Sequence, residues 1–164
     1  MRKAFTLLYM ALVMLAGGQT VPAYLPNPSL TPGAINPALT KEVICANGWS
    51  TKSVRGTTAK VKNAVYRAYG IKTHKAGQYE IDHLCSLEIG GADVQSNLWP
   101  QSYTGAWNAH IKDELENTLH REVCSGKSDL ATVQAEIKTN WIDCYKKHIG
   151  DPTHNKAWPT GVKP

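Results

Sequence analysis

Residues 79–91 read YEIDHLCSLEIGG, and this stretch decides the fold. From its first residue to Ile89, alternate positions are mainly apolar, which predicts a β-strand with one face toward a core. A Gly-Gly pair then breaks the pattern. Residues 97–101, NLWPQ, follow after a short loop. The stretch therefore predicts a strand, a glycine loop, and then a second strand or loop.

Helical periodicity flanks this stretch on both sides. Before it, the apolar spacing predicts a helix over 58–69 that stops at Gly70. After it, apolar residues at every fourth position predict a helix over 106–123, and Ser128 is expected to cap a last helix that ends by Gly150. This order of elements is typical of a small α+β domain.

The two ends of the sequence differ from the middle. Residues 1–23 combine a positive start, an apolar run of 13 residues and a small-residue cleavage site, which is typical of a secretory signal. That run is shorter than the roughly 20 residues of a membrane helix. Residues 24–40 hold four prolines and predict an extended arm. We expect the folded domain over 41–150 and a loose tail over 151–164.

The composition indicates a globular protein. At 164 residues, with 42% hydrophobic and 19% charged residues, the chain is long enough for one core and unlike a disordered segment. Its formal net charge of +5 falls to +3 without Arg2 and Lys3. A positive charge of that size is compatible with a polyanion and equally with ordinary solubility. We expect a secreted or periplasmic protein with no integral membrane segment after removal of the signal.

The sequence contains four cysteines, which are Cys45, Cys85, Cys124 and Cys144. An even count in an exported chain predicts two disulfides, because the compartment is oxidising. No pair has the Cys-x-x-Cys spacing of a zinc ribbon. Three connectivities remain open at this point.

A dipeptide and two further polar residues could carry chemistry. The Asp82-His83 pair lies on the predicted strand, Asn97 follows the glycine loop, and His110 lies near the start of a helix. Phosphodiester cleavage needs a base, a cation and donors for the phosphate. Each residue also has an ordinary structural interpretation, as a core histidine, a turn asparagine or an exposed helical histidine. Strict alternation sends Asp82 and His83 to opposite faces, so both reach one site only if the strand bends or ends there.

Taken as a whole, residues 79–91 together with 97–101 resemble the core of the HNH endonucleases, which are metal-dependent nucleases with a ββα-metal fold. The chain more closely resembles a group of secreted bacterial and phage HNH-like proteins over about residues 31–146. The flanking matches are Pro32-Gly33-Ala34-Ile35-Asn36-Pro37, Ile44-Cys45, Lys112-Asp113, Leu115-Glu116 and Val123-Cys124. The resemblance implies a small α+β domain with a ββα-metal core, additional helices and disulfide bonds.

The resemblance also implies roles for single residues. His83 matches the general base, Asp82 the first metal ligand, and Asn97 the residue that positions the histidine. The family's usual position for the last ligand falls on an alanine here, so His110 is the expected ligand and would need a longer preceding loop.

Two further residues, Asn108 and Asp113, are fallback ligands. Lys112 and Arg55 are predicted to bind phosphate oxygens of the substrate. A domain in which none of the candidate ligands reaches the site would be a degenerate, non-cleaving one.

We therefore expect an exported, metal-dependent HNH-type endonuclease that cleaves DNA, with RNA as an open alternative, and with little sequence preference. One divalent ion is expected. Mg²⁺ comes first because it binds few protein ligands, and an imidazole ligand also admits Mn²⁺, Ni²⁺ or Zn²⁺. The alternatives are a non-catalytic nucleic-acid or envelope-binding module on a degenerate HNH fold, and a small secreted structural or toxin-like protein.

The cysteine positions and the resemblance together indicate a disulfide pairing. Cys85 falls on the apolar face of the predicted strand and Cys144 on the apolar stripe of the last helix, so both should point into the core and meet. The related proteins keep the Ile-Cys and Val-Cys pair, which implies Cys45–Cys124. We predict the pairs Cys45–Cys124 and Cys85–Cys144.

Overall fold

The computed structural model describes residues 24–151, so the predicted signal (1–23) and nearly all of the predicted tail lie outside the described residues. In chain order the helices and strands are α1 (Lys41–Ile44), α2 (Ala59–Ala68), β1 (Tyr79–His83), β2 (Leu98–Ser102), α3 (Ala109–Ser125) and α4 (Leu130–His148). The α+β class is confirmed. Within the described part of the chain, no helix is long and apolar enough to cross a membrane.

The two strands form an antiparallel hairpin that is shorter than the sequence predicts. β1 pairs with β2 from Tyr79 opposite Ser102 to His83 opposite Leu98. The strand was expected to continue to Ile89, but the chain turns after His83 and forms a 3₁₀ turn at Leu87–Ile89. Residues 84–87 and Ile89 are all buried, so the compact turn places the apolar residues of the pattern inside without the alternation of a strand.

The Gly-Gly pair makes this turn possible. Gly90 has φ +79°, in the left-handed region that favours glycine. At Gly91 an added Cβ would lie 1.9 Å from the backbone oxygen of Cys85, so no larger residue fits without moving the loop. The two glycines thus let the chain return to β2 immediately after the buried turn.

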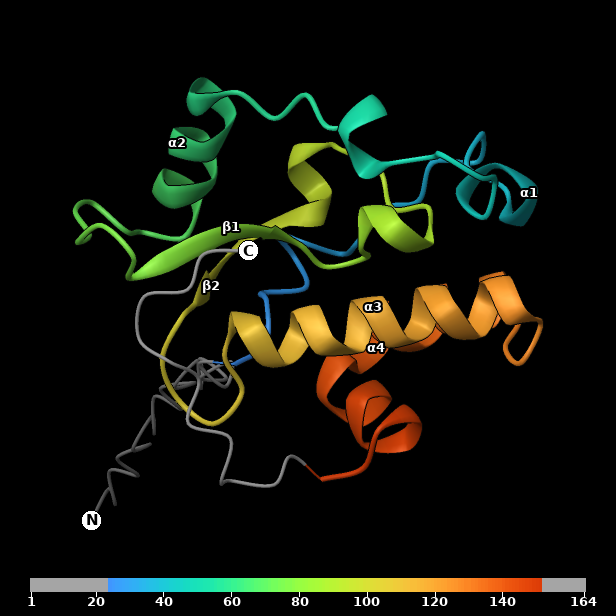
Figure 1. Cartoon of the computed structure of the whole chain (residues 1–164). Coiled ribbons are helices and arrows are strands. Elements are labelled where there is room, and N and C mark those ends of the chain that lie inside the picture. The colour runs from blue at the N-terminus through green and yellow to red at the C-terminus, as the bar shows by residue number, and fades with distance from the viewer. Residues whose placement is uncertain (1–23, 152–164) are drawn as a thin grey trace, which may run out of the picture.

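The two faces of the hairpin are covered by different helices. On one face Ile81 and Leu98 pack with Val65 of α2. On the other face Trp99 joins the main core, to which α3 and α4 contribute most of the side chains. Figure 1 shows α2 on one side of the hairpin and α3 with α4 on the opposite side.

Polar side chains cap the starts of these helices. Thr58, where a helix was predicted to begin, caps α2, with its side chain accepting from the backbone N–H of Val61. Asp129, and not Ser128, caps α4 by accepting from the N–H of Thr132 at 2.9 Å. Ser128 instead donates its hydroxyl to a carboxylate of α3 at 2.8 Å. Two potential capping residues are adjacent here, and the serine is held by a tertiary contact.

The proline-rich segment 24–40 packs against the domain. Thr31 is completely buried and donates its hydroxyl to the backbone oxygen of Leu98 at 2.8 Å. Leu39 belongs to the main core, and Ile35 forms a bridge with Gly91. The segment was predicted to be an arm outside the core, but its few apolar and hydroxyl side chains anchor it to the hairpin.

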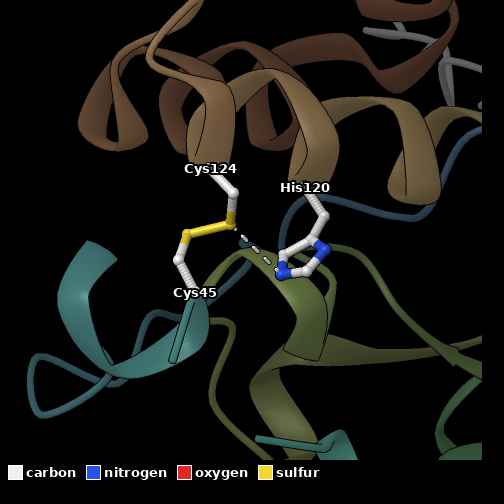
Figure 2. A group of neighbouring side chains, drawn as sticks. All are labelled: Cys45, His120 and Cys124. Carbon is white, nitrogen blue, oxygen red and sulfur yellow. Dashed lines mark hydrogen bonds between the residues drawn. A yellow bond between two sulfur atoms is a disulfide. The ribbon is translucent and has the colours of Figure 1, made fainter. Parts of the chain in front are cut away.

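One predicted disulfide is present. Cys45, at the end of α1, is bonded to Cys124 near the end of α3, with the two Cα atoms 5.4 Å apart. Figure 2 shows the imidazole of His120 beside this bridge, with Nε2 3.5 Å from the sulfur of Cys124. The bridge ties the short N-terminal helix to the long helix across 79 residues of chain.

The second predicted disulfide is wrong in this structure, because Cys85 and Cys144 are both free, buried thiols. Both belong to the main hydrophobic cluster. The sulfur of Cys144, however, lies beside Glu136 and His148 of its own helix. The two cysteines therefore belong to one core, but their sulfur atoms are not bonded to each other.

We expect two free thiols per chain when the unreduced protein is denatured and titrated with a thiol reagent. Reduction of Cys45–Cys124 should lower the free energy of unfolding by about 4 kcal/mol, because the open chain regains the entropy of a long loop. Denaturant unfolding with and without reductant measures this change. A titration that finds no free thiol would restore the Cys85–Cys144 pairing.

Candidate active site

A cleft of about 450 Å³ lies between the end of the hairpin and α3, and both Asp82 and His83 line it. Their shared position is possible because β1 ends at His83, which releases the side chains from strict alternation. Arg55, which is exposed, lies at the same cleft, as its predicted role requires. The lining includes five carboxylates, which are Glu80, Asp82, Glu88, Asp113 and Glu116.

His83 is held by a carboxylate that the sequence analysis did not identify. Its Nε2 lies 2.8 Å from Oδ1 of Asp93, and only 5% of its side chain is exposed. Because an ionised carboxylate can only accept, Nε2 carries the proton and Nδ1 the lone pair. Burial lowers the pKa of His83, although the hydrogen bond to Asp93 and the nearby carboxylate charges oppose this. The imidazole is therefore neutral near pH 7 and able to accept a proton.

Asp93 is itself fixed from outside the hairpin. It accepts hydrogen bonds from the backbone N–H of Gly56 and the hydroxyl of Thr57. Burial raises the pKa of Asp93, but these bonds and the one from His83 outweigh it, so the net shift is downward. The residue lies in the loop after the Gly-Gly pair, where no periodicity marks it. The only sign of this role in the sequence is that Asp93 is an acidic residue that follows His83 by ten positions.

Asn97 was predicted to position His83. Its side chain is completely buried, and the hydrogen bond of the His83 imidazole goes to Asp93 and not to Asn97. The amide oxygen accepts from the N–H of Cys85 at 2.9 Å, and the amide nitrogen donates to the backbone oxygens of Cys85 and Ala92 at 2.9 and 2.8 Å. Asn97 thus positions the histidine only indirectly, by holding the turn that follows it.

Lys112 was predicted to bind phosphate, but its side chain is completely buried. The ammonium lies 2.8 Å from Oδ2 of Asp82, forms a second ion pair with Glu116, and donates to the backbone oxygen of His83 at 2.7 Å. Burial lowers the pKa of Lys112, and the charges of the two carboxylates outweigh this and raise it. Lys112 is therefore a permanently charged internal cation under the cleft.

The three candidates for the last metal ligand are separated by the fold. Asn108 is the N-cap of α3 and accepts from the N–H of Ile111 at 3.2 Å. His110 is not part of the cleft lining, and its ring lies at a tilt against that of Tyr103, with the ring centroids 5.3 Å apart. Asp113 does line the cleft. The structure thus favours Asp113, a fallback, over His110.

The carboxylates on the acidic side of the cleft lie close enough to repel one another. Burial, followed by the charges of Glu80 and Asp82, raises the pKa of Asp113 to about 7. Burial and the charge of Asp82 also raise the pKa of Glu80. One oxygen of Glu88 is buried and has no hydrogen-bond partner among the described residues. A hard divalent cation fits this donor set, since Mg²⁺ prefers carboxylate oxygens.

The cleft is not a fully assembled metal site. Within the described residues, three potential ligand atoms lie within 4.8 Å of one another in two other places. One is the group of Cys45, His120 and Cys124, whose sulfurs are joined in the disulfide (Figure 2). The other group belongs to α4.

Comparisons of the chain with protein-family models, with curated proteins and with solved structures found no match. The resemblance to the HNH endonucleases therefore depends on the residues quoted from the sequence. In the structure, the Asp-His pair, an acidic helix face and an exposed arginine meet in the cleft.

Proposed function

We propose that this protein is an exported, metal-dependent endonuclease of the HNH type that hydrolyses phosphodiester bonds of DNA. The observation that supports this most is the convergence of His83, Asp82 and Asp113 on one cleft formed by a hairpin and the following helix. That order of two strands and a helix is the one expected of a ββα-metal core. The disulfide Cys45–Cys124 supports export to an oxidising compartment.

His83 would act as the general base. A neutral imidazole whose Nε2–H donates to Asp93 presents Nδ1 as its proton acceptor, and the carboxylate stabilises the imidazolium that forms. Asp93 is anchored to the segment before α2, and Asn97 holds the turn after the histidine. The base would therefore be pre-organised by two loops.

Asp82 and Asp113, with Glu80 beside them, would hold the cation, and His110 would lie at the rim. A bound divalent ion would supply the positive charge that stabilises the leaving sugar oxygen. The acidic lining repels a phosphate group on its own, so substrate binding in this cleft should depend on the cation. Arg55 would contact a neighbouring phosphate from the exposed edge.

We expect the purified protein to nick plasmid DNA in the presence of Mg²⁺ or Mn²⁺ and to lose this activity completely in EDTA. Gel electrophoresis of plasmid over time measures the nicked and linear forms. Restoration by excess Mg²⁺ controls for unfolding caused by the chelator. Cleavage that continues unchanged in EDTA would exclude a metal-dependent mechanism.

A non-catalytic nucleic-acid-binding module is the second candidate, and one observation favours it. The ammonium of Lys112 already occupies one side of Asp82, which reduces the charge available to a metal ion. This candidate predicts DNA binding in a gel-shift assay without cleavage under any metal. The plasmid experiment therefore distinguishes the two.

A further inference from the structure

α4 changes direction in its middle, and its two halves run along different axes (Figure 1). At Asn140 the backbone is extended, with φ −162° and ψ 102°. The side-chain oxygen of Asn140 accepts from the N–H groups of Ile142 and Asp143 at 3.0 and 3.3 Å, so it caps the second half. The helix is thus two helical segments joined by a capped corner.

The corner brings together side chains that a straight helix would separate. Residues 12 positions apart in a straight α-helix lie about 18 Å apart along the axis. Here a carboxylate oxygen of Glu136 and Nε2 of His148 are 2.8 Å apart. Cys144, one turn before His148, adds its sulfur on the same helix face. One ligand atom from each of the three residues lies within 4.8 Å of the other two.

The thiol of Cys144 is the unusual member of this group. The residue is 3% exposed, and its sulfur has no hydrogen bond to any other described residue. Burial, and next the charge of Glu136, raises the pKa of Cys144 to about 12. A protonated, unpartnered thiol beside an imidazole and a carboxylate gains little from these neighbours unless a cation binds there.

His148 is oriented as a metal-binding histidine would be. Its Nδ1 lies 2.7 Å from a carboxylate oxygen of Glu122 on α3, and its side chain is 8% exposed. Glu122 in turn accepts from the hydroxyl of Ser128 at 2.8 Å and from Lys127. A carboxylate on the far nitrogen fixes the tautomer and ring orientation of histidines that bind zinc.

The group is also accessible. A pocket of about 310 Å³ opens beside Cys144 and Glu136, with Asn140 and Lys147 at its wall. The pocket provides an entry path and room for a water molecule. None of these residues lines the cleft of His83, so the two places are distinct.

We propose that Glu136, Cys144 and His148 form a zinc site, with water as the fourth ligand and Glu122 holding the histidine. Thiolate, imidazole and carboxylate together are a ligand set for Zn²⁺, whereas Mg²⁺ does not take a thiolate. Binding would replace the His148–Glu136 hydrogen bond by two bonds to the metal. The thiol proton of Cys144 and the proton shared by His148 and Glu136, where present, pass to the solvent. The site would lock the corner of α4 and tie it to α3.

Titration with Co²⁺ tests the site, because a cobalt–thiolate bond gives a near-ultraviolet charge-transfer band that oxygen ligands do not give. The protein is used with Cys45–Cys124 intact, without reductant and without oxygen. We expect one equivalent of Co²⁺ to produce the band and Zn²⁺ to abolish it. Absence of the band at saturating Co²⁺ would overturn the proposal.

Two cysteine variants assign the band to one sulfur atom, and two further variants test the histidine. Cys144→Ser should abolish it, whereas Cys85→Ser, which removes the other buried free thiol, should leave it unchanged. Glu122→Gln should weaken the affinity for Zn²⁺ by about 10–100-fold, because the histidine loses its carboxylate. If Cys144→Ser does not fold, His148→Gln provides the same assignment through a loss of affinity of at least about tenfold. A band that survives in Cys144→Ser or disappears in Cys85→Ser would contradict the site.

Discussion

Replacement of His83 by alanine is expected to reduce DNA cleavage by about 10²–10⁴-fold, because the variant lacks the base that takes the proton from water. The fold should persist, since the imidazole's only hydrogen bond among the described residues is to Asp93. Plasmid nicking measured in Mg²⁺ gives the rate, and circular dichroism checks the fold. His74→Ala is the control, because His74 is exposed and lies outside the cleft. Its contacts are a stack on Tyr66, an edge contact with Tyr79 and a hydrogen bond to the backbone oxygen of Lys75.

The pH profile separates the role of a base from that of a structural histidine. Cleavage should rise with pH through the pKa of His83, because only the neutral imidazole accepts a proton. Burial places that pKa below the ordinary value, and Asp93 opposes this shift. Asp93→Asn should therefore move the acidic limb to still lower pH and also reduce the rate. A rate in His83→Ala within threefold of wild type, or an unshifted limb in Asp93→Asn, would contradict the assignment.

The hairpin and its Asp-His pair could be predicted from the sequence, but the partners of that pair could not. The apolar alternation and the Gly-Gly break located β1 and the return to β2. Asp93 reaches His83 only because Gly56 and Thr57, from a segment far away in sequence, hold its carboxylate. No local pattern encodes such a tertiary contact. Asn97 was predicted to position the histidine, and in the structure its side chain hydrogen-bonds the backbone of the buried turn that follows His83.

The cysteines show the same limit. Cys85 and Cys144 both follow apolar patterns, and both patterns correctly predicted burial. The corner at Asn140 then turns the second half of α4, a change of direction that helical periodicity cannot reveal. The Cys85–Cys144 disulfide was predicted for a last helix without this change of direction, and it is not formed. The same corner brings Glu136 to the Cys144–His148 pair, from which it is 12 positions away at His148.

The burial of Lys112 had a signal that was overlooked. The apolar stripe of this helix was predicted on Trp107, Ile111, Leu115 and Leu119, with a spacing of four. Leu115 and Leu119 are buried as predicted, but the buried face of α3 continues through Lys112, close to the true period of 3.6 residues. A lysine on that face is rare unless it is paired, which directs attention to the acidic residues Asp82 and Glu116.

Lys112→Met is therefore expected to lower the free energy of unfolding by about 3–5 kcal/mol at neutral pH. Methionine retains much of the volume of the apolar stem, so the loss comes from the charge. Removal of the ammonium leaves Asp82 and Glu116 facing each other without a cation, and the backbone oxygen of His83 loses its donor. Urea unfolding of wild type and variant measures the difference. Lys127→Met is the control, because its ammonium is largely exposed, so solvent screens its ion pair with the carboxylate of Glu122, which should contribute less than about 1 kcal/mol.

The penalty should depend on pH in a defined direction. Burial raises the pKa of Glu116, and Lys112 opposes that rise; without the ammonium the pKa rises further. An acid whose folded-state pKa lies above its unfolded value stabilises the fold least at high pH, and this loss disappears as the pH falls below both values. The difference between Lys112→Met and wild type should therefore grow as the pH rises through the wild-type pKa of Glu116, which is about 8, and be smaller below it. The double variant Lys112→Met, Glu116→Gln should recover part of the stability, because one of the unpaired charges is gone. A penalty as small as that of Lys127→Met, or one that does not change with pH, would show that the buried ion pairs do not hold the hairpin to α3.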